Sequence, residues 1–289
     1  MSETQQTVLI TGATDGLGRA TAILLAGEGY RVFAAGRSAE KRAALERLAR
    51  ERKLALTPVE MDVNDDGSVE RAVAEVESAA GAIDVLVNNA GIVYVAVMEE
   101  IRLEDLRRQF ETNFFAIVRV TQRVLPRMRA RGRGRIINMS SVAGKMALPV
   151  MGPYAATKHA VEGMSDALRF EVYPFGIDVI LIEPGYIRTN IENVSTELSS
   201  AYVTAAEKSP YARVYANFLK TWRELTKDVK TTPEDCARVI LGAIRDTPPK
   251  ARYPVTRRAK IMTVMRRILS DKRMDRNIIR SFHLERGAK

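Results

Sequence analysis

Two side chains that lie four residues apart, Tyr154 and Lys158, are the first candidates for chemistry. They open a stretch with helical apolar spacing, so both are expected on one face of a helix. Free tyrosine, with a pKa of about 10, is a poor acid or base at neutral pH. A nearby ammonium favours the phenolate, so we expect Lys158 to lower the pKa of Tyr154. Such a tyrosine can protonate a carbonyl oxygen as hydride arrives, or accept the proton in reverse.

A tyrosine and a lysine at this spacing occur about once by chance in a chain of this length. Other residues must therefore support a catalytic role for the pair. Ser141 lies thirteen residues before Tyr154 and follows a predicted strand at 135–139. Ligands of an open parallel sheet bind beyond the carboxyl ends of its strands. Ser141 is therefore placed to hydrogen-bond a substrate oxygen.

Asparagines supply two more candidates. Asn89 follows a predicted strand at 83–88, and Asn113 interrupts an apolar helical stretch at 110–118. Each could equally be a turn or capping residue when taken alone.

A glycine-rich turn at 11–18 lies between a predicted strand at 7–11 and a helix at 17–29. A dinucleotide site needs a tight turn and helix N-terminal N–H groups that face the pyrophosphate. Gly12 permits the turn, Gly16 allows close approach, and Gly18 lets the helix pack on the strand. The spacing is G-x-x-x-G-x-G, unlike the common G-x-G-x-x-G. A turn without ligand is the alternative, but the flanking strand and helix favour a cofactor.

The residue after the second predicted strand indicates which cofactor. NAD-selective sites usually carry an acid about 20 residues past the glycines. Here Arg37 stands in that place, followed by Ser38. A planar guanidinium suits a 2′-phosphate, so we predict NADP(H); an ordinary surface arginine is the alternative.

Strands and helices alternate along the chain. This rhythm predicts an α/β fold: a Rossmann-type, doubly wound parallel sheet of about seven strands, with helices on both faces. We expect a catalytic domain at 1–255, interrupted at 185–231 by a substrate loop or lid rich in Ser, Thr, Glu and Tyr. The strands are predicted at 7–11, 31–35, 54–61, 83–88, 135–139, 177–182 and 252–255.

Composition excludes several classes. Apolar residues make up 46% of the 289, and a single cysteine, Cys236, rules out an intrachain disulfide. With one cysteine and two histidines we expect no metal site. The first residues lack the pattern of a signal peptide, and no apolar run approaches the roughly 20 residues that span a bilayer. A cytoplasmic protein is expected.

The net charge of +10 resides in the last forty residues. They carry thirteen basic and three acidic residues, so the first 249 carry thirty-two of each. A neutral body argues against nucleic acid. Residues 256–289 predict a basic amphipathic helical extension, with Ile261, Val264 and Ile268 at helical spacing. It could lie on an anionic membrane or pack against the substrate loop or another subunit.

Together these motifs resemble the short-chain dehydrogenase/reductase family in its compact single-domain branch. The likeness runs through about residues 7–250. It rests on 11–18, 62–63, 88–91, Asn113, 134–141, 154–158 and 184–189.

The resemblance implies a seven-stranded parallel sheet and a catalytic set of Asn113, Ser141, Tyr154 and Lys158. Asn113 would relay protons through water, and Lys158 would also hold the nicotinamide ribose. The helices near 103–131 and 154–173 would build a homodimer or homotetramer. Implied or predicted cofactor-binding residues are Gly12, Thr14, Asp15, Gly16, Leu17, Gly18, Arg37, Ser38, Asp62, Val63, Asn89, Ala90, Gly91, Tyr154, Lys158, Pro184, Gly185, Ile187 and Thr189.

Apolar residues flank the catalytic set and predict a pocket for a lipophilic carbonyl or alcohol. Residues 170–179 look like those of family members that act on steroids and retinoids. Plain core packing is the alternative for each pocket residue. Other functions left open are a 3-oxoacyl thioester reductase, a non-catalytic NADP(H) sensor and a sugar-nucleotide epimerase. The pocket is predicted from Val93, Tyr94, Met146, Leu148, Met151, Tyr186, Phe218 and Trp222.

Overall fold

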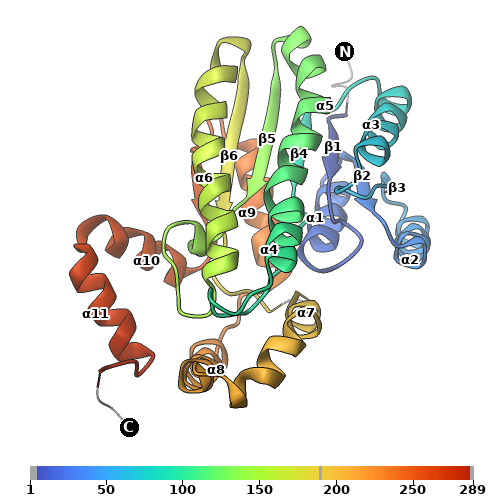
Figure 1. Ribbon diagram of the computed structural model, residues 1–289. Coiled ribbons are helices and arrows are strands. Elements are labelled where there is room, and N and C mark those ends of the chain that lie inside the picture. Colours follow the sequence, from blue (N-terminus) through green and yellow to red (C-terminus); the bar gives the residue numbers. More distant parts are fainter. Residues whose placement is uncertain (1–4, 189–190, 287–289) are drawn as a thin grey trace.

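The computed structural model describes residues 5–188 and 191–286, and its centre is a parallel sheet (Figure 1). Seven strands lie in the order β3-β2-β1-β4-β5-β6-β7, and each neighbouring pair is parallel. The predicted doubly wound sheet is confirmed. The strands are β1 (Thr7–Ile10), β2 (Arg31–Gly36), β3 (Leu56–Glu60), β4 (Val85–Asn88), β5 (Gly134–Met139), β6 (Ile177–Glu183) and β7 (Arg252–Pro254).

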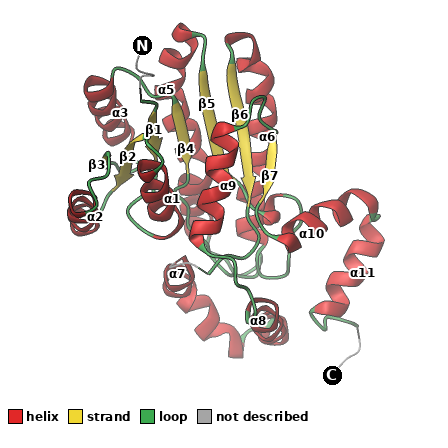
Figure 2. Cartoon of the chain, turned by 180° about the vertical axis from the view of Figure 1, so that it is seen from behind, coloured by secondary structure: helices red, strands yellow, loops and turns green. Residues whose placement is uncertain are grey.

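Helices cover both faces of the sheet (Figures 1 and 2). Side chains of a strand alternate between faces, so Val8 and Ile10 of β1 join one core while Leu9 joins the other. The first core is closed by α1 (Gly16–Gly27), α2 (Ala39–Glu51) and α9 (Pro233–Arg245). The second is closed by α3 (Asp66–Ala80), α5 (Ala116–Arg131) and α6 (Gly152–Val172).

Capping side chains fix the turns that follow the first three strands. Asp15 accepts a hydrogen bond from the Gly16 N–H, Ser38 from the Lys41 N–H, and Asp65 from the Ser68 N–H. Each cap satisfies a helix N–H that has no partner within the helix. The three helices therefore begin at defined points beside the carboxyl ends of the strands.

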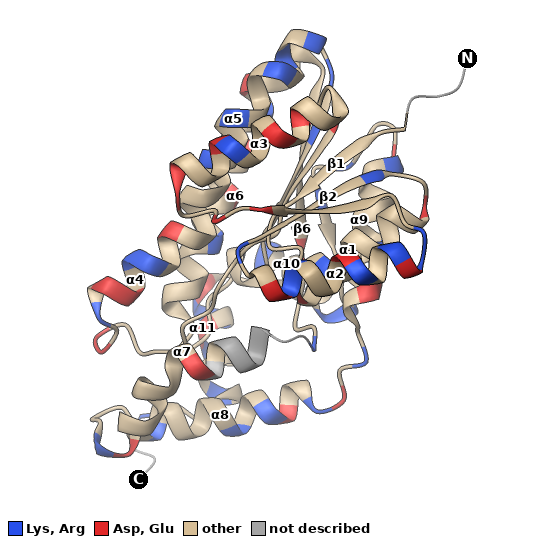
Figure 3. Cartoon of the chain, turned by 90° about the vertical axis from the view of Figure 1, so that its right-hand side faces the viewer, with Lys and Arg blue, Asp and Glu red and all other residues tan. Residues whose placement is uncertain are grey.

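Surface ion pairs join α3 to α5, where acidic and basic residues face one another (Figure 3). Arg119 bonds to Asp66, Arg123 lies 3.5 Å from Glu70, and Arg127 lies 3.0 Å from Glu77. Each pair has at least one exposed partner, and such pairs contribute at most about 1 kcal/mol each.

The helical stretch predicted near 103–131 is interrupted at Asn113. It consists of α4 (Leu103–Phe110), a π-helical turn η1 (Glu111–Phe115) and α5. π-turns inside helices are frequent at functional sites because the extra residue re-aims a side chain. Here the turn carries Asn113.

The segment 185–231, expected as a loop, is mainly helical, so that prediction is wrong in its secondary structure. It contains α7 (Ile191–Ala205), a 3₁₀ turn η4 (Ala206–Lys208) and α8 (Ala212–Thr226). In α8, Tyr215, Phe218, Leu219 and Trp222 recur at helical spacing and pack together. Both helices lie beyond the carboxyl ends of the strands (Figure 1).

The basic extension forms two helices, α10 (Arg257–Ile268) and α11 (Asp271–Ser281). Ala259 and Met274 are buried against Val142 and Met146, at and just after the 3₁₀ turn η2 (Val142–Gly144). The extension thus packs on the turn that follows β5. Within residues 5–188 and 191–286, no helix combines the length and apolar character needed to cross a bilayer.

Candidate active site

A cavity of about 1640 Å³ lies at the carboxyl ends of the strands. It begins at the point where the strand order reverses, between β1 and β4, which is the usual binding crevice of such sheets. Thr189 lies outside the described residues. All the other predicted cofactor residues line this cavity: Gly12, Thr14, Asp15, Gly16, Leu17, Gly18, Arg37, Ser38, Asp62, Val63, Asn89, Ala90, Gly91, Tyr154, Lys158, Pro184, Gly185 and Ile187.

The glycine turn fits a pyrophosphate because three of its residues, Gly12, Gly16 and Gly18, carry no side chain. Gly12 and Gly16 have φ of 62° and 50°, which favour glycine. A Cβ on Gly18 would collide with the Gly12 carbonyl oxygen and lie 2.9 Å from Ala13 Cα. The turn leads directly into the N-terminus of α1, where N–H groups attract an anion. These residues therefore suit a dinucleotide.

Asn89 braces the glycine turn. Its Nδ2 donates to the carbonyl oxygens of Thr11 (2.9 Å) and Gly12 (3.1 Å). In return the Thr11 hydroxyl accepts from the N–H groups of Asn89 (3.0 Å) and Ala90 (3.1 Å). The structure thus gives Thr11 a positioning role that the sequence did not indicate.

Basic side chains mark the end of the cavity beside β2. Arg37 is exposed and lines the cavity together with Lys41, which forms an ion pair with Asp15. Arg42 donates to the carbonyl oxygens of Gly36 (3.0 Å) and Arg37 (2.8 Å), and so fixes the backbone here. Lys41 was not predicted from the sequence as a residue of this site. Its position, four residues after Arg37, could have indicated a second cation beside the cofactor.

Ser141, Tyr154 and Lys158 meet on the cavity wall. Ser141 follows β5, and its hydroxyl caps η2 by accepting from the Ala143 N–H (3.1 Å). Tyr154 and Lys158 lie in the first two turns of α6, with Lys158 Nζ 5.7 Å from the centroid of the tyrosine ring. Lys158 Nζ donates to the carbonyl oxygen of Met139 (2.8 Å).

The electrostatics of this group differ from the expectation. Burial raises the pKa of Tyr154 to about 12, while a hydrogen bond with Ser141 lowers it in part. Burial lowers the pKa of Lys158 to about 8, and the charge of Glu162 opposes that fall. The predicted lowering of the Tyr154 pKa is therefore wrong here, because burial raises this pKa by more than the hydrogen bond with Ser141 lowers it. Tyr154 keeps its proton at neutral pH.

Asn113 is fully buried and does not line the cavity. Its amide makes two reciprocal hydrogen bonds with the backbone of Ile92, at 2.8 and 2.9 Å, and a third to the Thr157 hydroxyl (3.1 Å). The side chain therefore ties the turn after β4 to the helix that carries Tyr154. The structure shows this bracing contact, and the water relay stays a prediction.

Apolar side chains predominate where α8 and the extension line the cavity, although Arg223, Asp228 and Arg258 line it too. Trp222 packs edge-on against Tyr186 and stacks on Phe218, with ring centroids 5.5 and 5.6 Å apart. The extension adds residues that the sequence did not indicate: Met262, Met265, Met274, Ile278 and Phe282. The predicted residues on this wall are Val93, Met146, Leu148, Met151, Tyr186, Phe218 and Trp222.

Tyr94 is an exception among the predicted pocket residues. It is buried in a separate cluster with Ala96, Ile101 and Tyr202, outside the cavity lining. Val93 and Val95 on either side of it do line the cavity. Neighbours in extended backbone point in opposite directions, so placing Val93 and Tyr94 in one pocket was wrong.

Comparisons with known proteins agree with this geometry. The family model of the short chain dehydrogenases matches residues 6–199. The uncharacterized oxidoreductase YusZ of Bacillus subtilis is 36% identical over 261 residues, which cover 89% of this chain and 91% of that protein. Retinol dehydrogenase 8 of Bos taurus is 35% identical over 257 residues, which cover 87% and 82%.

Among solved structures, a variant of actinorhodin polyketide ketoreductase with NADPH is 31% identical with a TM-score of 0.75. The match covers 88% of this chain and 97% of that one. The chain belongs to the short-chain dehydrogenase/reductase family. It is an oxidoreductase of that family, whose members use a nicotinamide cofactor.

Proposed function

We propose that this protein is an NADP(H)-dependent oxidoreductase that interconverts a carbonyl and an alcohol on a bulky apolar substrate of the steroid, retinoid or lipophilic ketone class. One observation carries the proposal: a single cavity joins the glycine turn and Arg37 to Ser141, Tyr154 and Lys158, and ends in an apolar chamber. Support comes from the similar ketoreductase, which was solved with NADPH, and from the similar retinol dehydrogenase.

The residues divide the work of holding the cofactor. The glycine turn and the N-terminus of α1 would hold the pyrophosphate, and Arg37 with Lys41 the 2′-phosphate. Asp62 and Val63 would contact the adenine, Lys158 the nicotinamide ribose, and Ile187 with Thr189 the carboxamide. The bound cofactor supplies the hydride.

The chain supplies the proton. Tyr154, protonated at neutral pH, donates its phenolic proton to the carbonyl oxygen, and Ser141 hydrogen-bonds the same oxygen. The Lys158 ammonium stabilises the phenolate that forms. Asn89 and Asn113 have positioning roles. They hold the glycine turn and the turn after β4, which lie beside the cofactor and α6. The apolar chamber takes the body of the substrate and excludes water.

Cofactor selectivity tests the role of Arg37. We expect Arg37→Ala to lower kcat/KM for NADPH by about 10- to 100-fold, because a charge-assisted contact to phosphate is lost. The value for NADH should change little. Arg47→Ala, an exposed arginine on α2 that does not line the cavity, is the matched control. Equal losses with both cofactors would show that Arg37 does not read the 2′-phosphate.

A substrate panel tests the proposed reaction. Purified protein with NADPH is expected to reduce lipophilic ketones and aldehydes far faster than small polar keto acids. Faster turnover of 3-oxoacyl thioesters would replace the proposal by that alternative. Binding of NADPH without turnover of any carbonyl would favour a sensor.

Exposed aromatic residues favour self-association. Phe170 near the end of α6 is 75% exposed, Tyr173 directly after that helix is 80% exposed, and Phe115, the last residue of η1, is also exposed. We propose that these helices form a homodimer or homotetramer, which light scattering of the purified protein would measure as two or four times the chain mass.

The outer side of α10 favours contact with an anionic membrane. Ile261, Val264 and Ile268 are exposed among arginines and a lysine, and no acidic residue lies in the helix. We expect Ile268→Ser with Val264→Ser to reduce co-sedimentation with anionic phospholipid vesicles several-fold. Neutral vesicles are the control, and unchanged sedimentation of the variant would contradict the proposal.

A further inference from the structure

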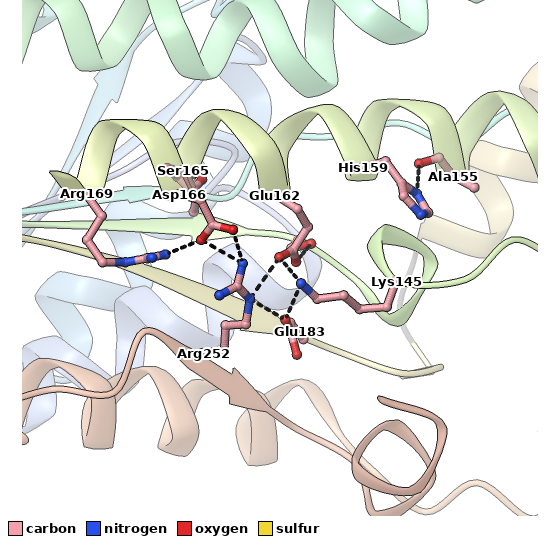
Figure 4. A network of polar contacts seen from close by, with 11 residues as sticks. Lys145, Ala155, His159, Glu162, Ser165, Asp166, Arg169, Glu183 and Arg252 are labelled. Atoms are coloured by element: carbon pink, nitrogen blue, oxygen red, sulfur yellow. Dashed lines mark hydrogen bonds and ion pairs between the residues drawn. The ribbon is translucent and has the colours of Figure 1, made fainter. Parts of the chain in front are cut away.

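A buried carboxylate lies directly behind the catalytic group. Glu162 follows Lys158 by one turn of α6 and is 5% exposed. Its Oε1 accepts a hydrogen bond from the Ser140 hydroxyl at 2.5 Å. Its Oε2 forms an ion pair with Lys145 and lies 3.1 Å from Arg252 Nε (Figure 4). These partners come from the segment after η2 and from β7, and no motif of the sequence pointed to them.

The cluster continues outward from Glu162. Glu183, the last residue of β6, places its Oε1 3.5 Å from Lys145 Nζ and 3.3 Å from Arg252 Nε. Arg252 Nη2 lies 2.7 Å from both carboxylate oxygens of Asp166 (Figure 4). Lys145 and Arg252 thus face both buried carboxylates, Glu162 and Glu183, and a buried carboxylate requires such a partner.

Glu162 reaches the catalytic group through Ser140. This serine stands between Met139, whose carbonyl oxygen binds Lys158, and Ser141. Gly144 packs tightly against both side chains, because a Cβ on this glycine would lie 2.7 Å from Ser140 Oγ and 3.0 Å from Glu162 Cγ. The hydrogen bond to Glu162 therefore fixes the backbone from which both Ser141 and the lysine contact extend.

We propose that Glu162 is a positioning residue: its carboxylate anchors Ser140 beneath Ser141 and places a negative charge one helical turn after Lys158. The inference rests on the proposed function, because the charge affects the reaction only if Lys158 takes part in it.

The sign of the effect follows from the groups around Lys158. Burial disfavours the ammonium and Glu162 favours it, so removing the negative charge lowers the pKa of Lys158 further below about 8. Removing a neighbouring cation has the opposite effect. The charged and titratable groups of the surrounding elements are Tyr154, Glu162 and Asp166 on α6, Lys145 after η2, Glu183 on β6 and Arg252 on β7.

Competitive acetylation measures the charge of Lys158 without any substrate. The enzyme is labelled with acetic anhydride across a pH series, and the modified lysine is quantified by mass spectrometry. We expect Glu162→Gln to shift the labelling midpoint of Lys158 down by about one pH unit. In the same variant, the alkaline limb of kcat for NADPH-dependent reduction should move down equally.

Three further variants separate charge from structure. Glu162→Asp keeps the charge and should leave the midpoint near the wild-type value. Lys145→Met should raise it, and this half-buried surface residue keeps the test available if Glu162→Gln does not fold. Glu171→Gln, which removes an exposed carboxylate of α6 outside this cluster, is the control and should leave the midpoint unmoved.

An unchanged Lys158 midpoint in Glu162→Gln, or a downward shift in Lys145→Met, would overturn the proposal. Because labelling needs no turnover, a wild-type protein that reduces no carbonyl would contradict the proposed function and leave this test intact.

Discussion

Tyr154→Phe is expected to lower kcat for carbonyl reduction by about 100- to 10,000-fold, the usual contribution of a positioned proton donor. The substitution removes one oxygen from the cavity wall and leaves the ring in place. NADPH affinity should therefore stay within a few-fold of wild type, and the loss should lie in kcat. Steady-state kinetics and fluorescence titration with NADPH measure the two quantities separately.

The matched control for Tyr154→Phe is Tyr30→Phe. Tyr30 lies directly before β2, is partly buried and does not line the cavity. Its variant should keep wild-type kinetics. Retention of more than a tenth of kcat by Tyr154→Phe would assign the proton to another group.

The pH dependence of the reduction has a defined sign. With the pKa of Tyr154 raised to about 12, the phenol is protonated through neutral pH and well above it. Lys158, with its pKa lowered to about 8, loses its charge first as the pH rises. The reductive kcat should therefore fall on the alkaline side near pH 8, well before the tyrosine titrates.

Gly18→Ala is expected to abolish measurable NADPH binding and to destabilise the fold by about 1–3 kcal/mol, the usual cost of overpacking. Its methyl group would meet the Gly12 carbonyl oxygen and Asn89 Nδ2, which are parts of the brace on the glycine turn. Thermal unfolding and NADPH titration measure the two effects.

Gly27→Ala is the control for this prediction. Gly27 ends the same helix α1, and a Cβ there would meet no atom within 4 Å. The variant should bind NADPH normally and be as stable as wild type or up to about 1 kcal/mol more stable. If Gly18→Ala bound NADPH as tightly as this control, the turn would not be the pyrophosphate site.

The sheet and the cofactor cleft could be predicted because their signals are local. Strands buried on both faces are short apolar runs, and glycines at fixed spacing state where backbone must approach a ligand. Ser141, Tyr154 and Lys158 could be brought together for a related reason. The carboxyl ends of parallel strands lie at the same edge of the sheet, and this does not depend on the helices and loops that connect the strands.

The misses share a different cause, since each depends on contacts between distant segments. Tyr94 follows Val93 directly, yet its burial is decided by Tyr202 and Ile101. Asn113 is set by a π-turn, which no residue pattern announces. The pKa of Tyr154 depends on how deeply the phenol is desolvated, and the Glu162 cluster joins residues up to 107 positions apart.

The apolar chamber shows both cases in one place. Phe218 and Trp222 could be predicted as pocket residues from their type, but their helix α8 could not be distinguished from a polar loop by composition. Met262, Met265 and Met274 reach the cavity only because α10 and α11 fold back over η2. The order of elements along the chain does not indicate that these two helices pack on η2.

Transfer of deuterium tests the central claim most directly. The purified protein is incubated with NADPH that carries deuterium at C4 of the nicotinamide and with a lipophilic ketone, and the product is analysed by mass spectrometry. We predict one deuterium on the carbinol carbon from one face of the cofactor, and none when Tyr154→Phe replaces the wild type over the same time. Alcohol formed without deuterium from either C4 position, or oxidation of NADPH without any alcohol, would contradict the account.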